Sequence, residues 1–264
     1  MVKKTGKVLV FLMMAFLCVF SVKASEKPVI VLAGIEDYAP YSFTVNDQHT
    51  GIYVDLMTEL FSRISYPIHI KLMPFNRVLH ETRTGTVSAV FGAYWTSDRT
   101  TYATYVEEPH LATISVALFV PKGSWIKQAT IENVTGAVIG YKMGFAMPVE
   151  YDAAVENDLF IKTEVRTAER LVKMLLAKRL DGFMHTIGQS QYYIEQLDKK
   201  QEIQQVSPLV FDERFTYLAF SNEALKTLPE ELLPLITQAL STMVQDGTFA
   251  SVYRKYNLSY VAEK

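Results

Sequence analysis

Val-Ile-Val-Leu-Ala at residues 29–33 is a continuous apolar run, and the prediction of the fold starts from it. A short run of this kind is typical of a strand buried on both faces, as in a parallel sheet. The loop from Gly34 to Pro40 follows, and three aromatic residues stand near its proline within the stretch 38–43. We therefore expect the folded part of the chain to begin with a buried sheet strand.

Beyond this strand, helix and strand patterns alternate along the chain. Gly51 opens a helix whose apolar side chains recur every four residues. Because parallel strands need helical crossovers, the order of elements predicts β-α-β units and an α/β fold. The elements expected after the first helix are a strand over 68–72, a helix over 75–84 that ends at Gly85, and a strand over 87–91 closed by Gly92.

The second half of the chain repeats this alternation. The long apolar segment from Ala112 to Val120 predicts a strand that leaves the first lobe. A second β-α pattern begins at residues 134–141. The remaining expected elements are a helix over 167–180, a strand that starts at 181, a strand over 215–220, and helices over 225–245 and 250–256.

The N-terminus has the composition of an export signal. Three lysines among the first seven residues precede an apolar run over 8–22. That run is shorter than the ~20 residues of a membrane-spanning helix. The run ends at Val22-Lys23-Ala24, with small or apolar residues at the positions that signal peptidase reads, so residues 1–24 are predicted to be a cleavable signal peptide that ends at Ala24. An uncleaved membrane anchor is the alternative.

Composition narrows the class of protein further. Cys18 is the single cysteine and lies in the predicted signal peptide, after Leu17 and not after the small residue that lipid attachment needs. The remaining chain therefore has no disulfide and depends on its hydrophobic core. Signal removal takes away four lysines and no acidic residue, which changes the formal net charge from −2 to −6. A mildly acidic chain without a basic stripe argues against nucleic acid as a partner.

Five motifs carry a resemblance to a known family, and they occupy residues 38–43, 51–56, 92–99, 136–144 and 245–256. The first three read Tyr-Ala-Pro-Tyr-Ser-Phe, Gly-Ile-Tyr-Val-Asp-Leu and Gly-Ala-Tyr-Trp-Thr-Ser-Asp-Arg. In this order they resemble the extracellular solute-binding proteins of the polar amino acid type. Members of that family serve ABC importers and have the type II periplasmic binding fold.

The resemblance implies two α/β lobes with a ligand cleft and two crossover hinge strands. Ligands of open α/β sheets sit beyond the carboxyl ends of the strands, and lobe closure around a hinge would signal binding. The implied division is a signal peptide over 1–24, a discontinuous lobe 1 over 25–113 and 215–264, and lobe 2 over 114–214.

The resemblance also implies ligand contacts. The loop over 92–99 is similar to one that grips a ligand carboxylate, which Arg99 can meet with its rigid fork of donors. The alternative for Arg99 is a surface pair with Asp98 or Glu107, and Arg77 is either a second cleft charge or a helix-surface arginine. The expected ligand-binding residues are Tyr38, Tyr41, Phe75, Arg77, Gly92, Tyr94, Trp95, Arg99, Met143, Phe145 and Thr186.

The aromatic members of this set would form flat apolar walls, and tyrosine adds a hydroxyl for a polar ligand. Core packing is the alternative for each of them. Met143 and Phe145 mark a turn of lobe 2 where backbone N–H groups at a helix start could bind an anion.

Three positions depart from the family pattern. Tyr94 stands where a hydroxyl residue is usual, and Gly-Phe-Ala at 144–146 replaces Gly-Thr-Thr. Thr186 stands where an acid normally pairs with the ligand's ammonium group. A neutral hydroxyl cannot do so, and burial of an unpaired ammonium is costly. A carboxylate without an amino group, or a bulkier ligand, is therefore as well supported as an α-amino acid.

We expect a periplasmic, monomeric solute-binding protein that captures a small, carboxylate-bearing ligand for an ABC importer, with no cofactor and no enzymatic activity. The five histidines show no metal-ligand spacing, and no phosphate-loop or dinucleotide motif occurs. One alternative is a periplasmic dehydratase-like enzyme, for which Glu36, Asp37 or Lys142 would supply the acid or base. Another is a sensor that passes ligand binding to a membrane signalling partner.

Overall fold

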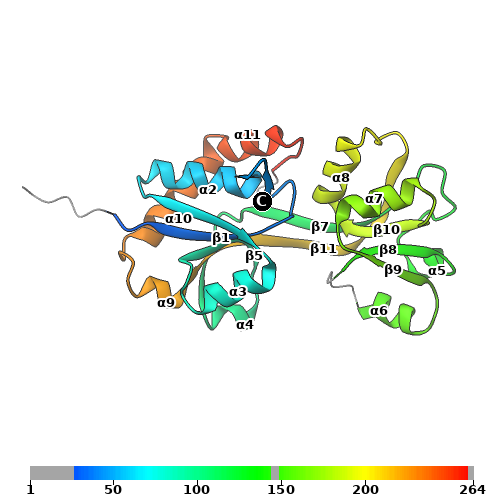
Figure 1. The fold of residues 1–264 in the computed structure, drawn as a ribbon, viewed down its shortest axis with the longest axis horizontal. Coiled ribbons are helices and arrows are strands. Elements are labelled where there is room, and N and C mark those ends of the chain that lie inside the picture. Colours follow the sequence, from blue (N-terminus) through cyan, green and yellow to red (C-terminus); the bar gives the residue numbers. More distant parts are fainter. Residues whose placement is uncertain (1–26, 144–148, 261–264) are drawn as a thin grey trace, which may run out of the picture.

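The computed structural model describes residues 27–143 and 149–260. The predicted signal peptide over 1–24 and the predicted ligand contact Phe145 lie outside these residues. Within them, the chain forms two α/β lobes joined by two long strands, as the sequence predicts (Figure 1).

A mixed sheet of nine strands runs through both lobes. Its order is β4-β1-β5-β11-β7-β10-β8-β9, with β6 paired to β11 beside this path, and β2 and β3 form a separate hairpin. The strands are β1 (Ile30–Ile35), β2 (Phe43–Val45), β3 (Gln48–Thr50), β4 (Ile68–Met73), β5 (Ala89–Tyr94), β6 (Ala103–Val106), β7 (Ala112–Pro121), β8 (Val138–Lys142), β9 (Ile161–Val165), β10 (Gly182–Thr186) and β11 (Ile203–Ser221).

Helices cover both faces of the sheet in each lobe (Figure 1). In lobe 1, α2, α10 and α11 lie on one face, and α3 and α4 lie on the other. In lobe 2, α7 and α8 lie opposite α5 and α6. The helices are α2 (Ile52–Arg63), α3 (Phe75–Arg83), α4 (Ser97–Thr100), α5 (Ile131–Val134), α6 (Val149–Glu156), α7 (Ala168–Leu176), α8 (Ile187–Gln196), α9 (Asn222–Leu225), α10 (Leu232–Gln245) and α11 (Thr248–Lys255).

Parallel pairing within the lobes confirms the expected β-α-β units. Strand β1 pairs in parallel with β4 and β5, and β8 pairs in parallel with β9 and β10. The apolar run at 29–33 forms most of β1, which lies between β4 and β5 in the sheet. Ile30, Leu32 and Ala33 have no exposed surface, as expected of a buried strand.

Each lobe has its own hydrophobic core. The largest cluster joins β1 and α2 near the N-terminus to α10 and α11 near the C-terminus, so lobe 1 is built from both ends of the chain. The clusters of lobe 2 draw on residues from 117 to 206. The exact boundaries, at 113/114 and 214/215, stay a prediction.

The two lobe-crossing strands are antiparallel partners. Strand β11 pairs with β7 from Ile203 to Thr216, but its register shifts between Val206 and Phe211 and again before Arg214. Pro208 lies in this interval and has no N–H to give to the ladder. Irregular pairing bends a strand and raises its local twist, so β11 departs from a regular ladder in this interval.

The structure corrects several expected boundaries. The strand expected over 215–220 already begins at Ile203 as β11, and the helix expected over 167–180 ends at Leu176 as α7. The strand expected to close at Gly92 continues to Tyr94 as β5, with Gly92 in a left-handed conformation inside it (φ 77°). The helix expected over 225–245 is divided into α9 and α10. Pro229 lies in the interruption, where its ring prevents a continuous helix.

Gly92 is required by two constraints that can be separated experimentally. A Cβ at Gly92 would lie 2.5 Å from the ring of Tyr53, whereas a Cβ at Gly123 (φ 80°) would meet nothing within 4 Å. Gly123→Ala should cost only the conformational strain, about 1–2 kcal/mol of unfolding free energy. Gly92→Ala should lose a further ~1–3 kcal/mol because the site is overpacked. Urea unfolding of both variants checks this, and equal losses would contradict the predicted clash.

Candidate ligand-binding site

A stack of tyrosines forms the lobe 1 wall behind the loop that leaves β1. The rings of Tyr38 and Tyr41 stack with centroids 5.0 Å apart, and those of Tyr41 and Tyr53 stack at 5.2 Å. Tyr53 shares a 2.7 Å hydrogen bond with the hydroxyl of Thr216. Burial raises the pKa of Tyr41 and of Tyr53, so both hydroxyls stay neutral. The wall is therefore rigid, with neutral hydrogen-bonding groups.

Arg99 lies beside this wall in the short helix α4, which begins where β5 ends. The hydroxyl of Thr96 accepts a bond from the backbone N–H of Arg99 and so caps the helix. The Nη1 of Arg99 donates to the carbonyl oxygen of Tyr94 at 2.8 Å, and its guanidinium carbon lies 5.3 Å from the ring centroid of Phe75.

No carboxylate neutralises Arg99 within the described part of the chain. Asp98 lies 3.8 Å from Arg83 instead, and no ion pair joins Arg99 to Glu107 among the described residues. Arg99 is partly buried, which leaves its remaining donors with less access to water. The surface-pair alternative for this arginine is therefore not what the structure contains.

Tyr94 lies in the same positive region. The hydroxyl of Tyr105 donates to the Tyr94 carbonyl at 2.8 Å, so this carbonyl accepts from two side chains. Burial raises the pKa of the Tyr94 hydroxyl. The positive charge of Arg214, the hydrogen bond with Tyr38 and the positive charge of Arg99 each lower it. Two arginines from different segments thus influence one hydroxyl at the end of β5.

Thr186 closes the lobe 2 side at the end of β10 and caps α8. It is 2% exposed, and its hydroxyl has no hydrogen-bond partner among the described residues. Its backbone carbonyl accepts from the hydroxyl of Ser190 at 2.8 Å. This buried position therefore presents a neutral hydroxyl and not a carboxylate.

His185 and Gln189 form a buried polar pair under the start of α8. The Nε2 of His185 and the Oε1 of Gln189 are 2.8 Å apart. Burial, reinforced by the positive charge of Lys142, lowers the pKa of His185 to about 3. The imidazole is therefore neutral at physiological pH and adds no positive charge.

Not all of the predicted contacts point toward one site. Arg77 is exposed and its Nε pairs with Glu81 on its own helix at 2.6 Å, as the helix-surface alternative expects. Trp95 and Met143 are about half exposed. Gly92 lies against the ring of Tyr53, so the absence of a side chain at this position is explained by packing and backbone conformation.

The two lobes touch at the start of α8. A Cβ at Gly188 would lie 2.3 Å from the hydroxyl of Tyr41, so this glycine lets the tyrosine approach. The rings of Phe43 and Tyr192 add a second contact, with centroids 5.7 Å apart. Sequence reasoning missed both contacts, because they join residues about 150 positions apart in the chain.

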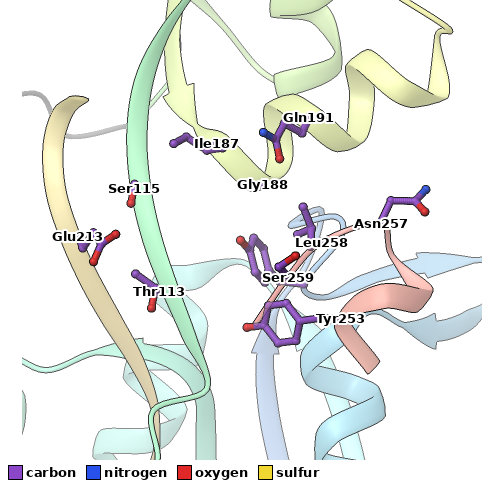
Figure 2. A pocket seen from close by; sticks show the side chains of 11 residues that line it. Thr113, Ser115, Ile187, Gly188, Gln191, Glu213, Tyr253, Asn257, Leu258 and Ser259 are labelled. Carbon is purple, nitrogen blue, oxygen red and sulfur yellow. The ribbon is translucent and has the colours of Figure 1, made fainter. Parts of the chain in front are cut away.

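A cavity of about 310 Å³ lies between the hinge strands, α8 and the C-terminal segment (Figure 2). Thr113, Ser115 and Glu213 come from the hinge strands, and Tyr41 is the one predicted contact that also lines it. Arg99, Tyr94 and Thr186 do not line this cavity. It is therefore distinct from the Arg99 region.

Neither a metal-binding cluster nor a membrane-spanning helix occurs among the described residues. They contain no group of three His, Cys, Asp or Glu side chains that could hold a metal ion. None of their helices has both the length and the apolar character needed to cross a membrane.

Solved structures with the same fold come from proteins of several roles. A substrate-binding protein of an ABC uptake transporter from Streptococcus pneumoniae with bound histidine is 19% identical, with a TM-score of 0.70 over 89% of this chain and 95% of that one. A histidine kinase sensor domain is 18% identical, with a TM-score of 0.67 over 89% and 99%. Substrate-binding domain 2 of GlnP from Lactococcus lactis, in an open conformation, is 19% identical, with a TM-score of 0.66 over 88% and 96%.

At these identities the structural neighbours establish the fold and not the ligand. No curated protein sequence matches the chain significantly. A family model, by contrast, matches residues 30–259, which is nearly all of the described chain. On this match, the chain belongs to the bacterial extracellular solute-binding proteins, family 3.

Proposed function

We propose that this chain is a monomeric periplasmic protein, released after Ala24 from its signal peptide, that captures a small carboxylate-bearing ligand for an ABC importer. The ligand would be an amino acid or a related acid. The observation that carries this proposal is the guanidinium of Arg99, held at the carboxyl end of β5 without an ion-pair partner among the described residues.

Arg99 suits this role because it is preorganised. Its hydrogen bond to Tyr94 and its contact with Phe75 restrict the side chain before a ligand arrives. Less conformational entropy is then lost on binding. A carboxylate that accepts two N–H bonds from a guanidinium gains charge-assisted hydrogen bonds in a fixed geometry. The tyrosine stack would provide the apolar wall and neutral hydroxyls beside it.

Closure of the lobes would complete the site. The irregular pairing between β7 and β11 supports a hinge there, because that interval has fewer ladder bonds to break. The contact of Tyr41 with Gly188 would then be part of the closed interface. A permease would read the relative positions of the two lobes.

The proposal assigns no catalytic step to the chain. Glu36 and Asp37, considered as acids or bases for a dehydratase-like enzyme, are both exposed. Neither carboxylate is enclosed in a water-excluded site of the kind that acid–base catalysis uses. Lys142 is partly buried and is better explained as a binding group, as argued below.

A sensing role is the second candidate. The observation in its favour is the likeness to a histidine kinase sensor domain, which this chain matches over nearly the whole of that domain. Ligand capture by Arg99 and lobe closure are common to both roles. A pull-down of the closed protein with membrane extracts would separate them by recovering either a permease or a kinase.

Arg99→Ala should strongly weaken recognition of carboxylates. Loss of charge-assisted hydrogen bonds worth about 1.5–3 kcal/mol predicts affinity weaker by roughly 10- to 100-fold. The measurement is a thermal-shift screen with amino acids and small carboxylates, in which bound ligand raises the melting temperature of the wild type. Arg170→Ala, on the exposed surface of α7, is the control and should behave as wild type. Unchanged affinity in Arg99→Ala would refute the assigned role.

Gly188→Ala should hold the lobes apart. The added methyl group would overlap the Tyr41 hydroxyl, and Tyr41 cannot yield because it is 4% exposed and stacked between two tyrosines. Small-angle scattering of the variant should give a larger radius of gyration than the wild type. Gly188→Ala combined with Tyr41→Phe removes the nearest atom and should restore part of the difference. Identical scattering curves for wild type and Gly188→Ala would contradict this contact.

A further inference from the structure

Lys142 is a cation at the lobe 2 edge of the cleft that the carboxylate-binding proposal does not use. It is the last residue of β8, and the parallel pairing of Met184 with Tyr141 puts it beside His185 of β10. Strand β10 is followed directly by α8, and Gly188 in the first turn of α8 touches Tyr41 of lobe 1. Lys142 therefore lies on the edge that faces lobe 1.

The ammonium group of Lys142 has lost part of its hydration without gaining a direct partner. Its side chain is partly buried, and its Nζ makes no hydrogen bond or ion pair with any described residue. Burial lowers its pKa, and the negative charge of Asp37 in the loop after β1 opposes this. A desolvated cation without a bonded counter-ion is costly, so it indicates a place for an anion.

The groups around Lys142 do not supply that anion. His185 is buried and neutral, and Thr186 is buried with a neutral hydroxyl. Asp37 is exposed, and it is not within ion-pair distance of Lys142. The lobe 2 edge is therefore positive and offers no buried acid among the described residues for a ligand's ammonium group.

Lobe 1 presents its own positive charge across the cleft. Arg99 lies at the end of β5, and Arg214 on the hinge strand β11 acts on the same Tyr94 hydroxyl. Two cationic edges that face each other in one cleft suit a ligand with an anionic group at each end.

We propose that the ligand is a dicarboxylate, with one carboxylate on Arg99 of lobe 1 and the other on Lys142 of lobe 2. This inference rests on the proposed function, because it assigns the ligand class of the same cleft. Each lobe then holds one end of the ligand, so only the closed protein satisfies both charges. Lys142 would make the protein discriminate against α-amino acids, whose ammonium group it repels.

Calorimetric titration of the mature protein with paired probes tests the assignment. The probes are succinate, glutarate and adipate, each compared with the monocarboxylate of equal chain length, together with the standard α-amino acids. The wild type should prefer one of the dicarboxylates to its monocarboxylate by at least ~10-fold, which corresponds to a single charge-assisted hydrogen bond. Lys142→Met should remove this preference and leave monocarboxylate binding unchanged. Lys173→Met, an exposed lysine paired with Glu169 on α7, should match the wild type.

Thr186→Asp provides a second, independent variant. A carboxylate at the end of β10, on the same edge of lobe 2 as Lys142, should weaken dicarboxylate binding and strengthen the binding of α-amino acids, because it pairs with their ammonium group. The dicarboxylate assignment is overturned if α-amino acids bind the wild type best and Lys142→Met leaves every affinity unchanged. In that outcome Arg99→Ala would still weaken binding by roughly 10- to 100-fold, and the proposed function would stand. A wild type that binds none of these acids would overturn both.

Discussion

The antiparallel pairing of β7 with β11 is the interaction on which the rest of the structure depends. These two strands are the continuous connection between the lobes in one nine-stranded sheet. Their ladder shifts register twice between Val206 and Arg214, in the part of β11 that leads from lobe 2 to lobe 1. The same pair of strands therefore fixes the orientation of the two cleft edges, and the proposed hinge lies in its irregular interval.

The cleft edges differ in what they offer. Lobe 1 contributes a rigid stack of neutral tyrosines and the preorganised Arg99, whereas lobe 2 contributes the half-buried Lys142 and the neutral Thr186. Charges that are neutralised within one lobe would leave little reason for the lobes to close. Here Arg99 and Lys142 remain without bonded carboxylates among the described residues, so a ligand that supplies negative charge would favour closure.

Local patterns predicted most of the fold because they report burial directly. The continuous apolar run at 29–33, the four-residue spacing after Gly51 and the apolar segment from Ala112 all became the elements expected of them. The errors arose where a local rule met a tertiary constraint. Gly92 is typical of a strand end, but it lies inside β5 because the ring of Tyr53 needs the space that a side chain would fill.

The sequence by itself determined the α/β class, the family and the motif that contains Arg99, because apolar periodicity and short motifs are local properties of the chain. Only the tertiary structure decided which charges are neutralised. Arg77 and Arg99 carry the same side chain, and the sequence offers each of them a nearby carboxylate. Arg77 pairs with Glu81 one helical turn away, whereas Arg99 donates to the backbone carbonyl of Tyr94. The place of Lys142 was likewise decided by strand pairing and lobe contact, since it pairs with Val165 of β9 and lies beside His185 of β10, 23 and 43 residues distant in the chain.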